Sequence, residues 1–438
     1  MPEIKNIKAR QIFDSRGNPT VECDIILNNN LLGRASVPSG ASTGLHEAIE
    51  LRDNDPKKYN GKSVKTAISN ILEIIKPQVL NKKFSDFEEF DKTILNIDGT
   101  PNKSKIGANA ILALSLAFTK AISLDQDCPM YKFLSKDINY TLPVPMMNII
   151  NGGAHADNNI DIQEFMIAPI GAPNFSEAVR YGSEIFHSLK LNLKSKGLNT
   201  NIGDEGGFAP NLNSTTESLD YILEAIRSVG LKIKEDILIS LDIASSEFYS
   251  DNKYHLKGEK KLLSSDQMVE YLNELITLYP IYSIEDGLSE DDWDGWKNLT
   301  SKLGNKVQLV GDDLFVTNYE RLKKGINNSI ANSILIKLNQ IGTLSETLSV
   351  MKLAKKNNYN CIVSHRSGET EDTSIADLSV GMSSGQIKTG SITRTDRTSK
   401  YNQLLRIEEE LGDKGDYAGK SILRYWQSHL VFDLINFI

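Results

Sequence analysis

Hydrophobic and polar residues alternate along an early segment of the chain, which predicts β-strands. Residues 20–27 read Thr-Val-Glu-Cys-Asp-Ile-Ile-Leu, and residues 31–37 read Leu-Leu-Gly-Arg-Ala-Ser-Val. Three asparagines, residues 28–30, separate the two segments. A period of two interrupted by a short polar turn predicts an antiparallel hairpin or meander.

Apolar residues at helical spacing follow this sheet. The pattern predicts helices over residues 63–75 and over the alanine-rich segment 105–124. Strands followed by helices indicate an α+β domain over residues 1–140. The segment 141–145 contains two prolines and marks the boundary, because proline holds itself and the preceding residue in extended conformations.

After residue 145 the pattern changes to short apolar β-type segments that alternate with amphipathic helices. Two helices, over about 174–197 and 214–230, separate the second strand from the third. This alternation predicts a mostly parallel sheet, and eight strands favour a closed β/α barrel over residues 141–438. An open doubly wound sheet usually carries G-x-G-x-x-G after its first strand, which residues 151–155 (Asn-Gly-Gly-Ala-His) do not match. The expected strands cover residues 146–150, 163–169, 237–244, 281–286, 307–313, 333–339, 361–368 and 386–390.

Polar side chains stand at the ends of several of these strands. The carboxyl ends of barrel strands converge on one mouth, where the active sites of such barrels lie. The sequence therefore predicts one bowl that contains three carboxylates, two lysines, an arginine and a histidine. The strand-end residues are Asp242, Glu285, Asp312, Lys337, His365, Arg366, Ser367 and Lys388.

Each of these residues alone is best explained as a helix cap, a turn former or a solvated charge. Three carboxylates that converge would repel one another and raise their own pKa values. A hard divalent cation resolves this conflict, and Mg²⁺ prefers carboxylate oxygens and water. The absence of a His/Cys cluster argues against zinc. The cationic side chains indicate a substrate with several negative charges, such as a phosphorylated carboxylate.

Three loops allow both an ordinary and a functional interpretation. Residues 203–207 (Gly-Asp-Glu-Gly-Gly) form either a simple turn or a flexible segment that carries the acid Glu205 over the mouth. Residues 39–46 are either a surface loop or a lid from the first domain, and they lack the lysine of a phosphate-binding P-loop. His155 follows a glycine pair and is either a surface residue or part of the site.

Composition narrows the class of protein. Lys and Arg number 49 and Asp and Glu number 57, a net charge of −8, which argues against general affinity for nucleic acid or acidic lipid. The three cysteines are scattered, so we expect neither a disulfide framework nor a zinc–thiolate site. We expect no signal peptide and no membrane span, because the start of the chain is polar and no 18 consecutive residues are apolar. The expected location is the cytoplasm.

Thirteen motifs, in order along the chain, resemble those of the enolase family. The series runs from about residue 3 to residue 412, so the resemblance covers both predicted domains. The series includes DSRGNPTVE (14–22), SVPSGASTGLHEAIELRD (36–53), NIINGGAHADN (148–158), GDEGGFAP (203–210) and VSHRSGETED (363–372).

This resemblance implies the reversible dehydration of 2-phosphoglycerate to phosphoenolpyruvate and water, with two Mg²⁺ in each active site. Lys337 then corresponds to the base that takes the C2 proton, and Glu205 to the acid that helps the C3 hydroxyl to leave. A lysine is a base only when neutral, so we expect Mg²⁺ and cationic neighbours to lower the pKa of Lys337.

The resemblance also implies the ligands of the metals and of the substrate. Arg366 and Ser367 correspond to phosphate contacts, Lys388 to a partner of the substrate carboxylate, and Glu164 to a residue close to the leaving hydroxyl. The implied metal ligands are Asp242, Glu285 and Asp312 for one ion and Ser42 for the second. The implied substrate-binding residues are His155, Gln163, Glu164, His365, Arg366, Ser367 and Lys388.

The implied fold is an α+β N-terminal domain followed by a barrel of order ββαα(βα)6, whose second strand runs antiparallel to the others. Family members form dimers through their N-terminal domains, with Glu22 and Arg406 at positions that pair across the interface, and some bacterial members form octamers. By analogy with the family, a cell-surface or secreted pool accompanies the cytoplasmic one.

The chain departs from the family in two places. Asp396 stands where most enolases have Glu, and residues 421–438 form an apolar, aromatic ending that is unlike the usual short one. Packing on the barrel is the simplest interpretation of this ending, because so many exposed apolar residues would favour aggregation. An oligomer contact or a partner site are the alternatives.

Two other functions remain open at this level. A superfamily relative, such as a racemase or cycloisomerase, would act on a carboxylate without phosphate, but such relatives lack the GDEGG loop and the set Arg366, Ser367 and Lys388. A surface or scaffold binding protein that reuses the enolase fold is the alternative from another class.

Overall fold

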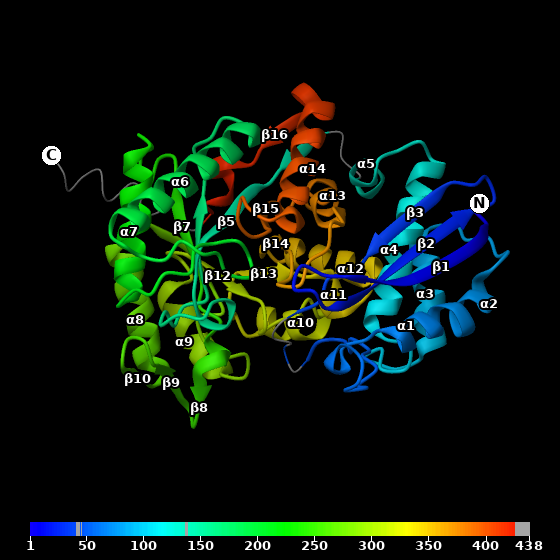
Figure 1. Cartoon of the computed structure of the whole chain (residues 1–438), viewed down its shortest axis with the longest axis horizontal. Helices are drawn as coiled ribbons and strands as arrows, with labels where there is room; N and C mark the ends of the chain where they lie inside the picture. The colour runs from blue at the N-terminus through cyan, green and yellow to red at the C-terminus, as the bar shows by residue number, and fades with distance from the viewer. Residues whose placement is uncertain (41–43, 45, 136–138, 425–438) are drawn as a thin grey trace.

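The computed structural model describes residues 1–40, 44, 46–135 and 139–424, and it contains two parts (Figure 1). A three-stranded sheet with its helices forms the N-terminal part, drawn in blue and cyan. A closed barrel surrounded by helices forms the larger part, drawn from green to red. Ser42 and most of the predicted apolar ending, residues 425–438, lie outside the described residues.

The N-terminal sheet has the order β1-β2-β3, and both pairs of strands are antiparallel. The predicted meander is therefore confirmed for β2 (Pro19–Leu27) and β3 (Leu32–Ser36), and β1 (Ile4–Phe13) adds a strand that the alternation did not indicate. The inward-facing side chains of β2 are fully buried because a long helix covers that face.

That covering helix is α4 (Ala108–Asp125), in the region predicted as helical. It lies so close to the sheet that a Cβ on Gly33 of β3 would stand only 2.0 Å from the Ala117 carbonyl oxygen. By length and composition α4 could cross a membrane, but 83% of it is buried inside the structure, as expected of a core helix.

Shorter helices complete the N-terminal part. The predicted helix over 63–75 is confirmed with one difference, because its middle is a π-helical segment (Asn70–Ile75) and the helix continues to Val79. Helix α3 was not predicted; it is capped by the Asp86 carboxylate, which accepts from the Glu89 amide at 2.8 Å. These helices are α1 (Lys65–Ser69), α2 (Lys76–Val79), α3 (Phe87–Asp98) and α5 (Met130–Leu134).

Eight strands close the barrel in the order β11-β12-β13-β14-β15-β5-β6-β7, which confirms the predicted number and closure. Strand β6 is antiparallel to both of its neighbours, and the other pairs are parallel, as the enolase order ββαα(βα)6 implies. The strands are β5 (Val144–Asn151), β6 (Glu164–Ala168), β7 (Leu238–Asp242), β11 (Ile281–Glu285), β12 (Gln308–Gly311), β13 (Ser333–Ile336), β14 (Asn360–Ser364) and β15 (Gly385–Lys388).

Helices surround this barrel, and two of them separate β6 from β7 as predicted. Several begin at a side chain that accepts from the backbone, and α8 has a complete capping box between Ser264 and Gln267. The helices are α6 (Phe175–Ser195), α7 (Thr215–Ser228), α8 (Ser265–Leu278), α9 (Trp293–Leu303), α10 (Tyr319–Asn327), α11 (Leu338–Ile341), α12 (Leu344–Lys356), α13 (Ser374–Gly381) and α14 (Thr395–Leu411).

Two small sheets were not predicted. Strands β8 (Tyr249–Ser250), β9 (Lys253–Leu256) and β10 (Lys261–Leu263) form an antiparallel excursion between β7 and α8. Strand β4 (Tyr140–Leu142), just before the barrel, pairs in parallel with β16 (Gly415–Tyr417), just after α14.

The interior of the barrel is filled by side chains. Five of them form a separate apolar cluster with no exposed surface, and they come from five different strands. A β/α barrel packed in this way has no channel, so its chemistry is confined to the ends of the strands. The five residues are Met146, Met166, Val310, Leu335 and Ile362.

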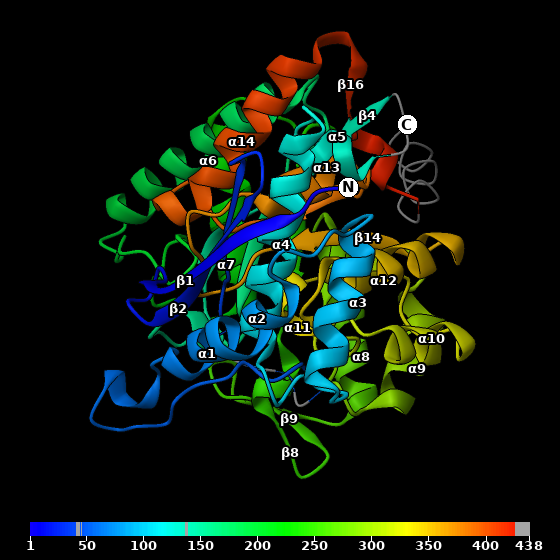
Figure 2. The same ribbon diagram turned by 90° about the vertical axis from the view of Figure 1, so that its right-hand side faces the viewer.

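Helices α3 and α4 of the N-terminal part contact helices α11 and α12 of the barrel part (Figure 2). The N-terminal part caps α12, since Asp91 of α3 accepts from the Ser345 amide at 2.9 Å and Ser115 of α4 accepts from the Leu344 amide at 3.0 Å. Lys103 places its Nζ 3.0 Å from Glu346 Oε1 in the same contact.

Asp91 makes this contact sensitive to pH. Burial raises the pKa of Asp91 to about 6, well above the value of about 3.9 for an exposed Asp. Its contribution to stability is therefore complete below about pH 4 and is lost as the pH rises through 6. We expect the free energy of unfolding of the parent, relative to that of Asp91→Asn, to fall by up to about 3 kcal/mol between pH 4 and 7. Chemical unfolding of both proteins across this range tests it, and a constant difference would contradict it.

Candidate active site

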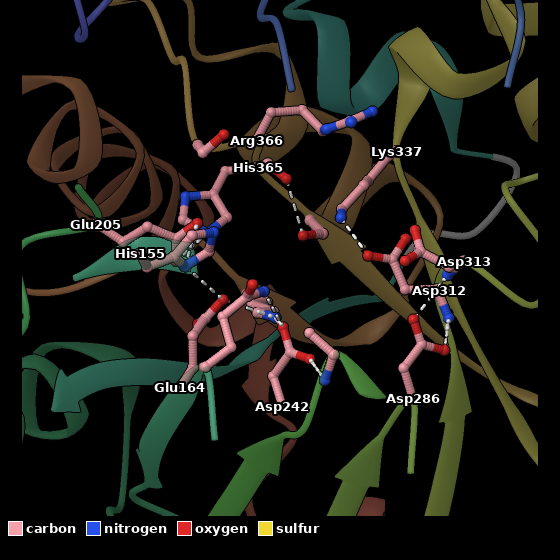
Figure 3. Close-up of a pocket in the computed structure, with 15 residues that line it drawn as sticks. His155, Glu164, Glu205, Asp242, Asp286, Asp312, Asp313, Lys337, His365 and Arg366 are labelled. Carbon is pink, nitrogen blue, oxygen red and sulfur yellow. Dashed lines mark hydrogen bonds and ion pairs between the residues drawn. The ribbon is translucent and has the colours of Figure 1, made fainter. Parts of the chain in front are cut away.

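The predicted strand-end residues meet in one pocket at the mouth of the barrel (Figure 3). Glu285 does not line the pocket; it is completely buried, and its Oε1 lies 2.9 Å from Nζ of Lys388, which does line it. The residues that line the pocket are His155, Gln163, Glu164, Glu205, Asp242, Ala244, Asp286, Asp312, Asp313, Lys337, Ser364, His365, Arg366, Ser367 and Lys388.

Strand register places the carboxylates side by side. Asp242 ends β7 and Glu285 ends β11, and these two residues are direct partners in the parallel pairing of the two strands. Asp312 follows β12, the next strand around the barrel. Gln163 approaches from the start of β6, with its Nε2 3.3 Å from Asp242 Oδ2.

Lys388 is the central cation of the pocket. Its Nζ lies 2.7 Å from Asp242 Oδ2, 2.9 Å from Glu285 Oε1 and 3.1 Å from Glu164 Oε1. Burial acts to lower the pKa of Lys388, but these carboxylates raise it well above its usual range. The ammonium is therefore held charged, and it balances part of the negative charge that the strand ends bring together.

Lys337 forms an ion pair with Asp312 on the other side of the pocket (Figure 3). Burial acts to lower the pKa of Lys337, and Arg366 and Lys388 act in the same direction, but Asp312 raises the pKa above its ordinary value. The expected lowering of this pKa concerns the site with Mg²⁺ bound; in the protein alone the pairing with Asp312, which the sequence does not show, acts in the opposite direction.

Two glutamates and two histidines form a third cluster. His365 Nε2 lies 3.1 Å from Glu205 Oε2, and His155 Nδ1 lies 3.7 Å from Glu205 Oε1 and 3.6 Å from Glu164 Oε1. Burial lowers the pKa of both histidines, that of His365 to about 3, so both are neutral near pH 7.

The two glutamates of this cluster share one proton. Burial, together with the negative charge of Glu205, raises the pKa of Glu164 well above its usual range. Burial also acts to raise the pKa of Glu205, but the neighbouring His365 and His155 and the positive charge of Arg397 together bring it below the ordinary value. Of the two, Glu164 is therefore the one that more readily carries a proton in the protein alone.

The pocket fits a divalent cation. Oε2 of Glu285 is buried and, among the described residues, has no hydrogen-bond partner. Burial and then Asp242 raise the pKa of Glu285 well above its usual range, so a nearby cation would stabilise the ionised form. Ligand atoms of Asp286, Asp312 and Asp313 lie within 4.8 Å of one another, as do those of His155, Glu164 and Glu205.

Three residues of this region were not predicted from the sequence. Asp286 accepts from the Asp312 amide at 2.9 Å and from the Asp313 amide at 2.8 Å, so it holds the turn after β12 in place. Asp286 and Asp313 are the second acidic residues of their motifs, IED and GDD, which was the available signal. Glu47 comes from the N-terminal part, where the sequence gives no sign of a contact with the barrel.

Glu47 brings the N-terminal part into the site. It forms a double ion pair with Arg366, with Nη1 2.9 Å from Oε2 and Nη2 3.2 Å from Oε1. Nearby, Ser39 and Gly368 exchange two backbone hydrogen bonds, of 2.8 and 2.9 Å. The start of the segment 39–46, for which a lid is one interpretation, is thus hydrogen-bonded to the barrel. Residues 41–43 and 45 of this segment lie outside the described residues.

Fold and site together define an enzyme built on a β/α barrel, with a buried acid–base pocket suited to an anionic substrate. Residues 4–134 match the family model "Enolase, N-terminal domain", and residues 139–426 match "Enolase, C-terminal TIM barrel domain". A curated enolase of Legionella pneumophila (strain Lens) is 59% identical over 421 residues, which cover 96% of this chain and 99% of the relative. The chain belongs to the enolase family, that is, to the phosphopyruvate hydratases among the lyases.

Proposed function

We propose that this protein catalyses the reversible dehydration of 2-phosphoglycerate to phosphoenolpyruvate and water as the enolase of glycolysis. The observation that carries the proposal is the arrangement of one pocket (Figure 3). Lys337 stands on one side, Glu164 and Glu205 stand on the other, and Arg366 lies between them. A base and an acid on opposite sides of a bound substrate suit the removal of a proton and a hydroxyl from adjacent carbons.

Lys337 is the proposed base. Its side chain follows β13 directly and is only 14% exposed, so its Nζ is held at a defined place in the pocket. To accept the C2 proton it must first lose its own proton, and it can do so only when Asp312 no longer serves as its counter-ion.

Glu205 is the proposed acid, and Glu164 is its partner. Their shared proton lies beside the place of the leaving hydroxyl, which departs as water once it is protonated. That proton can pass from Glu164 to Glu205 only if no other group of the cluster takes it up. The lowered pKa values of the two histidines make them poor acceptors for it.

The proposed metal ligands are Asp242, Glu285 and Asp312 for one Mg²⁺ and Ser42 for a second. Bound Mg²⁺ supplies Lewis-acid stabilisation of the negative charge that builds up on the substrate carboxylate when its α-proton leaves.

The remaining side chains bind and orient the substrate in this proposal. Arg366 and Ser367 face the phosphate. To bind it, Arg366 gives up its ion pair with Glu47. Lys388 faces the substrate carboxylate, while His155, His365 and Gln163 line the walls. The phosphate and the carboxylate thus each have a cationic partner within one pocket.

A direct test follows the ultraviolet absorbance of phosphoenolpyruvate as it forms from 2-phosphoglycerate. We expect a rise in the presence of Mg²⁺ that excess EDTA abolishes and added Mg²⁺ restores. Turnover of phosphate-free hydroxy acids instead would favour the racemase or cycloisomerase alternative. No turnover by folded protein would favour a scaffold role for the fold.

We also propose that the chain acts in the cytoplasm, with a surface pool by family analogy, and that it forms a homodimer, with the octamer as a higher form. Supporting the dimer, a cavity of about 310 Å³ between the N-terminal sheet and the barrel is lined by Glu22, Glu369, Glu371 and Asp396. Such an acidic groove suits a basic side chain such as the partner subunit's Arg406.

The proposed domains are residues 1–140 and 141–438.

A further inference from the structure

Arg397 is a buried arginine behind the pocket that the proposed chemistry does not use. It has no exposed surface, and it belongs to the first turn of α14. Its Nη1 donates to His365 Nδ1 and to the Arg366 carbonyl, the latter at 2.5 Å. Its Nη2 donates to the Ser367 carbonyl at 2.6 Å and to the Asp204 carbonyl at 3.3 Å, and Asp396 Oδ2 lies 2.8 Å from its Nε.

Gly390 shows how closely these groups are packed. A Cβ at this residue would stand 2.8 Å from Arg397 Cδ, 3.0 Å from the Glu205 carbonyl oxygen and 3.0 Å from His365 Cε1. The φ of +76° at Gly390 is also a conformation that favours glycine. Arg397, His365 and the loop that carries Glu205 therefore meet beside Gly390.

The contact with Arg397 determines where the proton of His365 can be. A guanidinium only donates hydrogen bonds and stays protonated, so Nδ1 of His365 must accept and cannot carry a proton there. The proton of the neutral ring is then on Nε2, the atom that lies 3.1 Å from Glu205 Oε2. We propose that Arg397 is a positioning residue, which keeps His365 a neutral imidazole with its proton on Nε2, the ring nitrogen on the side of Glu205.

The charged groups around His365 agree with this assignment. Arg397 of α14 and Lys388 of β15 act against a positive charge on the ring, and Glu205 of the 203–207 loop acts in favour of one. Burial is the largest influence and also favours the neutral ring. Without Arg397, Nδ1 would lose its hydrogen-bond donor and its positive neighbour, and an imidazolium paired with Glu205 through Nε2 would form more easily.

This inference rests on the proposed function in one respect, the role of Glu205 as the acid. An imidazolium at His365 would hold Glu205 ionised and take up the proton that the acid has to deliver. A neutral ring orients the carboxylate without competing for the proton.

The test is NMR of the full-length protein with ¹⁵N-labelled histidine, from pH 5.5 to 8.5. The His365→Gln variant identifies the His365 signals among the six histidines of the chain. In the parent we expect a neutral ring with its proton on Nε2 throughout this range. In Arg397→Met we expect His365 to gain a proton at Nδ1 within this range, so that its titration midpoint moves from below pH 5.5 into the range, and kcat to fall about tenfold or more.

Lys400→Met is the matched control, because Lys400 is an equally buried cation of the same helix. Lys400 Nζ donates to the Thr370 carbonyl at 2.6 Å and lies 2.8 Å from Glu369 Oε2, away from His365. We expect this variant to be less stable and the His365 signals to stay unchanged.

Two results would overturn the proposal. One is a parent spectrum with the proton on Nδ1, or with His365 titrating in this range, which needs no variant to fold. The other is a folded Arg397→Met whose His365 behaves as in the parent. The role of Glu205 is tested separately, because loss of turnover in Glu205→Gln supports it, while the spectra are recorded without substrate and do not depend on it.

Discussion

Replacing Lys337 with alanine is expected to lower kcat by about 10²- to 10⁴-fold, the range that a positioned general base contributes. The fold should survive, because Asp312 keeps its hydrogen bond from Gln340 Nε2 at 2.9 Å. The expected loss is specific to proton removal. In D₂O the parent should exchange the C2 hydrogen of 2-phosphoglycerate, and the variant should not.

The control for this variant is Lys103→Ala. Lys103 is also a buried lysine with a carboxylate partner, Glu346 at 3.0 Å, but it lies between the two parts of the molecule. We expect Lys103→Ala to lower the thermal stability and to leave the C2 exchange in place. Unchanged exchange in Lys337→Ala would show that another group is the base.

The second large effect is expected in Lys388→Met, and it concerns stability. The substitution removes the cation from three buried carboxylates, Asp242, Glu285 and Glu164. Breaking a buried ion pair from one side costs about 3–5 kcal/mol. In EDTA we therefore expect a clear fall in the melting temperature of the variant.

Addition of Mg²⁺ should restore part of this stability, because a divalent cation can take over the positive charge among these carboxylates. In Lys400→Met, which removes a cation from Glu369 instead, Mg²⁺ should give no more stabilisation than in the parent. Equal effects of Mg²⁺ on Lys388→Met and on the parent would contradict the proposed metal ligands.

The barrel was predictable from the sequence because its strands are short, apolar and buried on both faces, as in β7 (Leu238–Asp242) and β11 (Ile281–Glu285). Seven of the eight predicted strands ran one to four residues past the observed end, and the strand predicted at 146–150 ended one residue before β5 does. Strand β1 was missed because most of its residues are only partly buried, so its alternation is weak. The β8–β10 excursion is short and mixed in polarity, and it depends on contacts that only the folded chain provides.

For the site, the strand ends were the part that the sequence could predict. Asp242, Glu285, Asp312, Lys337 and Lys388 follow apolar strands directly, so a barrel brings them together. The choice of partners was not predictable, since the pairing of Lys337 with Asp312 depends on distances of a few ångströms across the mouth. The contact of Glu47 with the site was not predictable for another reason, because Glu47 belongs to the N-terminal part and not to the barrel.

The parallel pair of β4 and β16 joins the two ends of the barrel region. Tyr140–Leu142 precedes the first barrel strand and Gly415–Tyr417 follows the last helix, so the pair closes a loop that contains the whole barrel. Closing a loop costs chain entropy once, and this cost grows only slowly with the length of the loop. Fraying that starts at either end of the barrel region must first break the pairing of β4 with β16. The beginning and the end of the barrel should therefore open together, as one cooperative unit in hydrogen exchange.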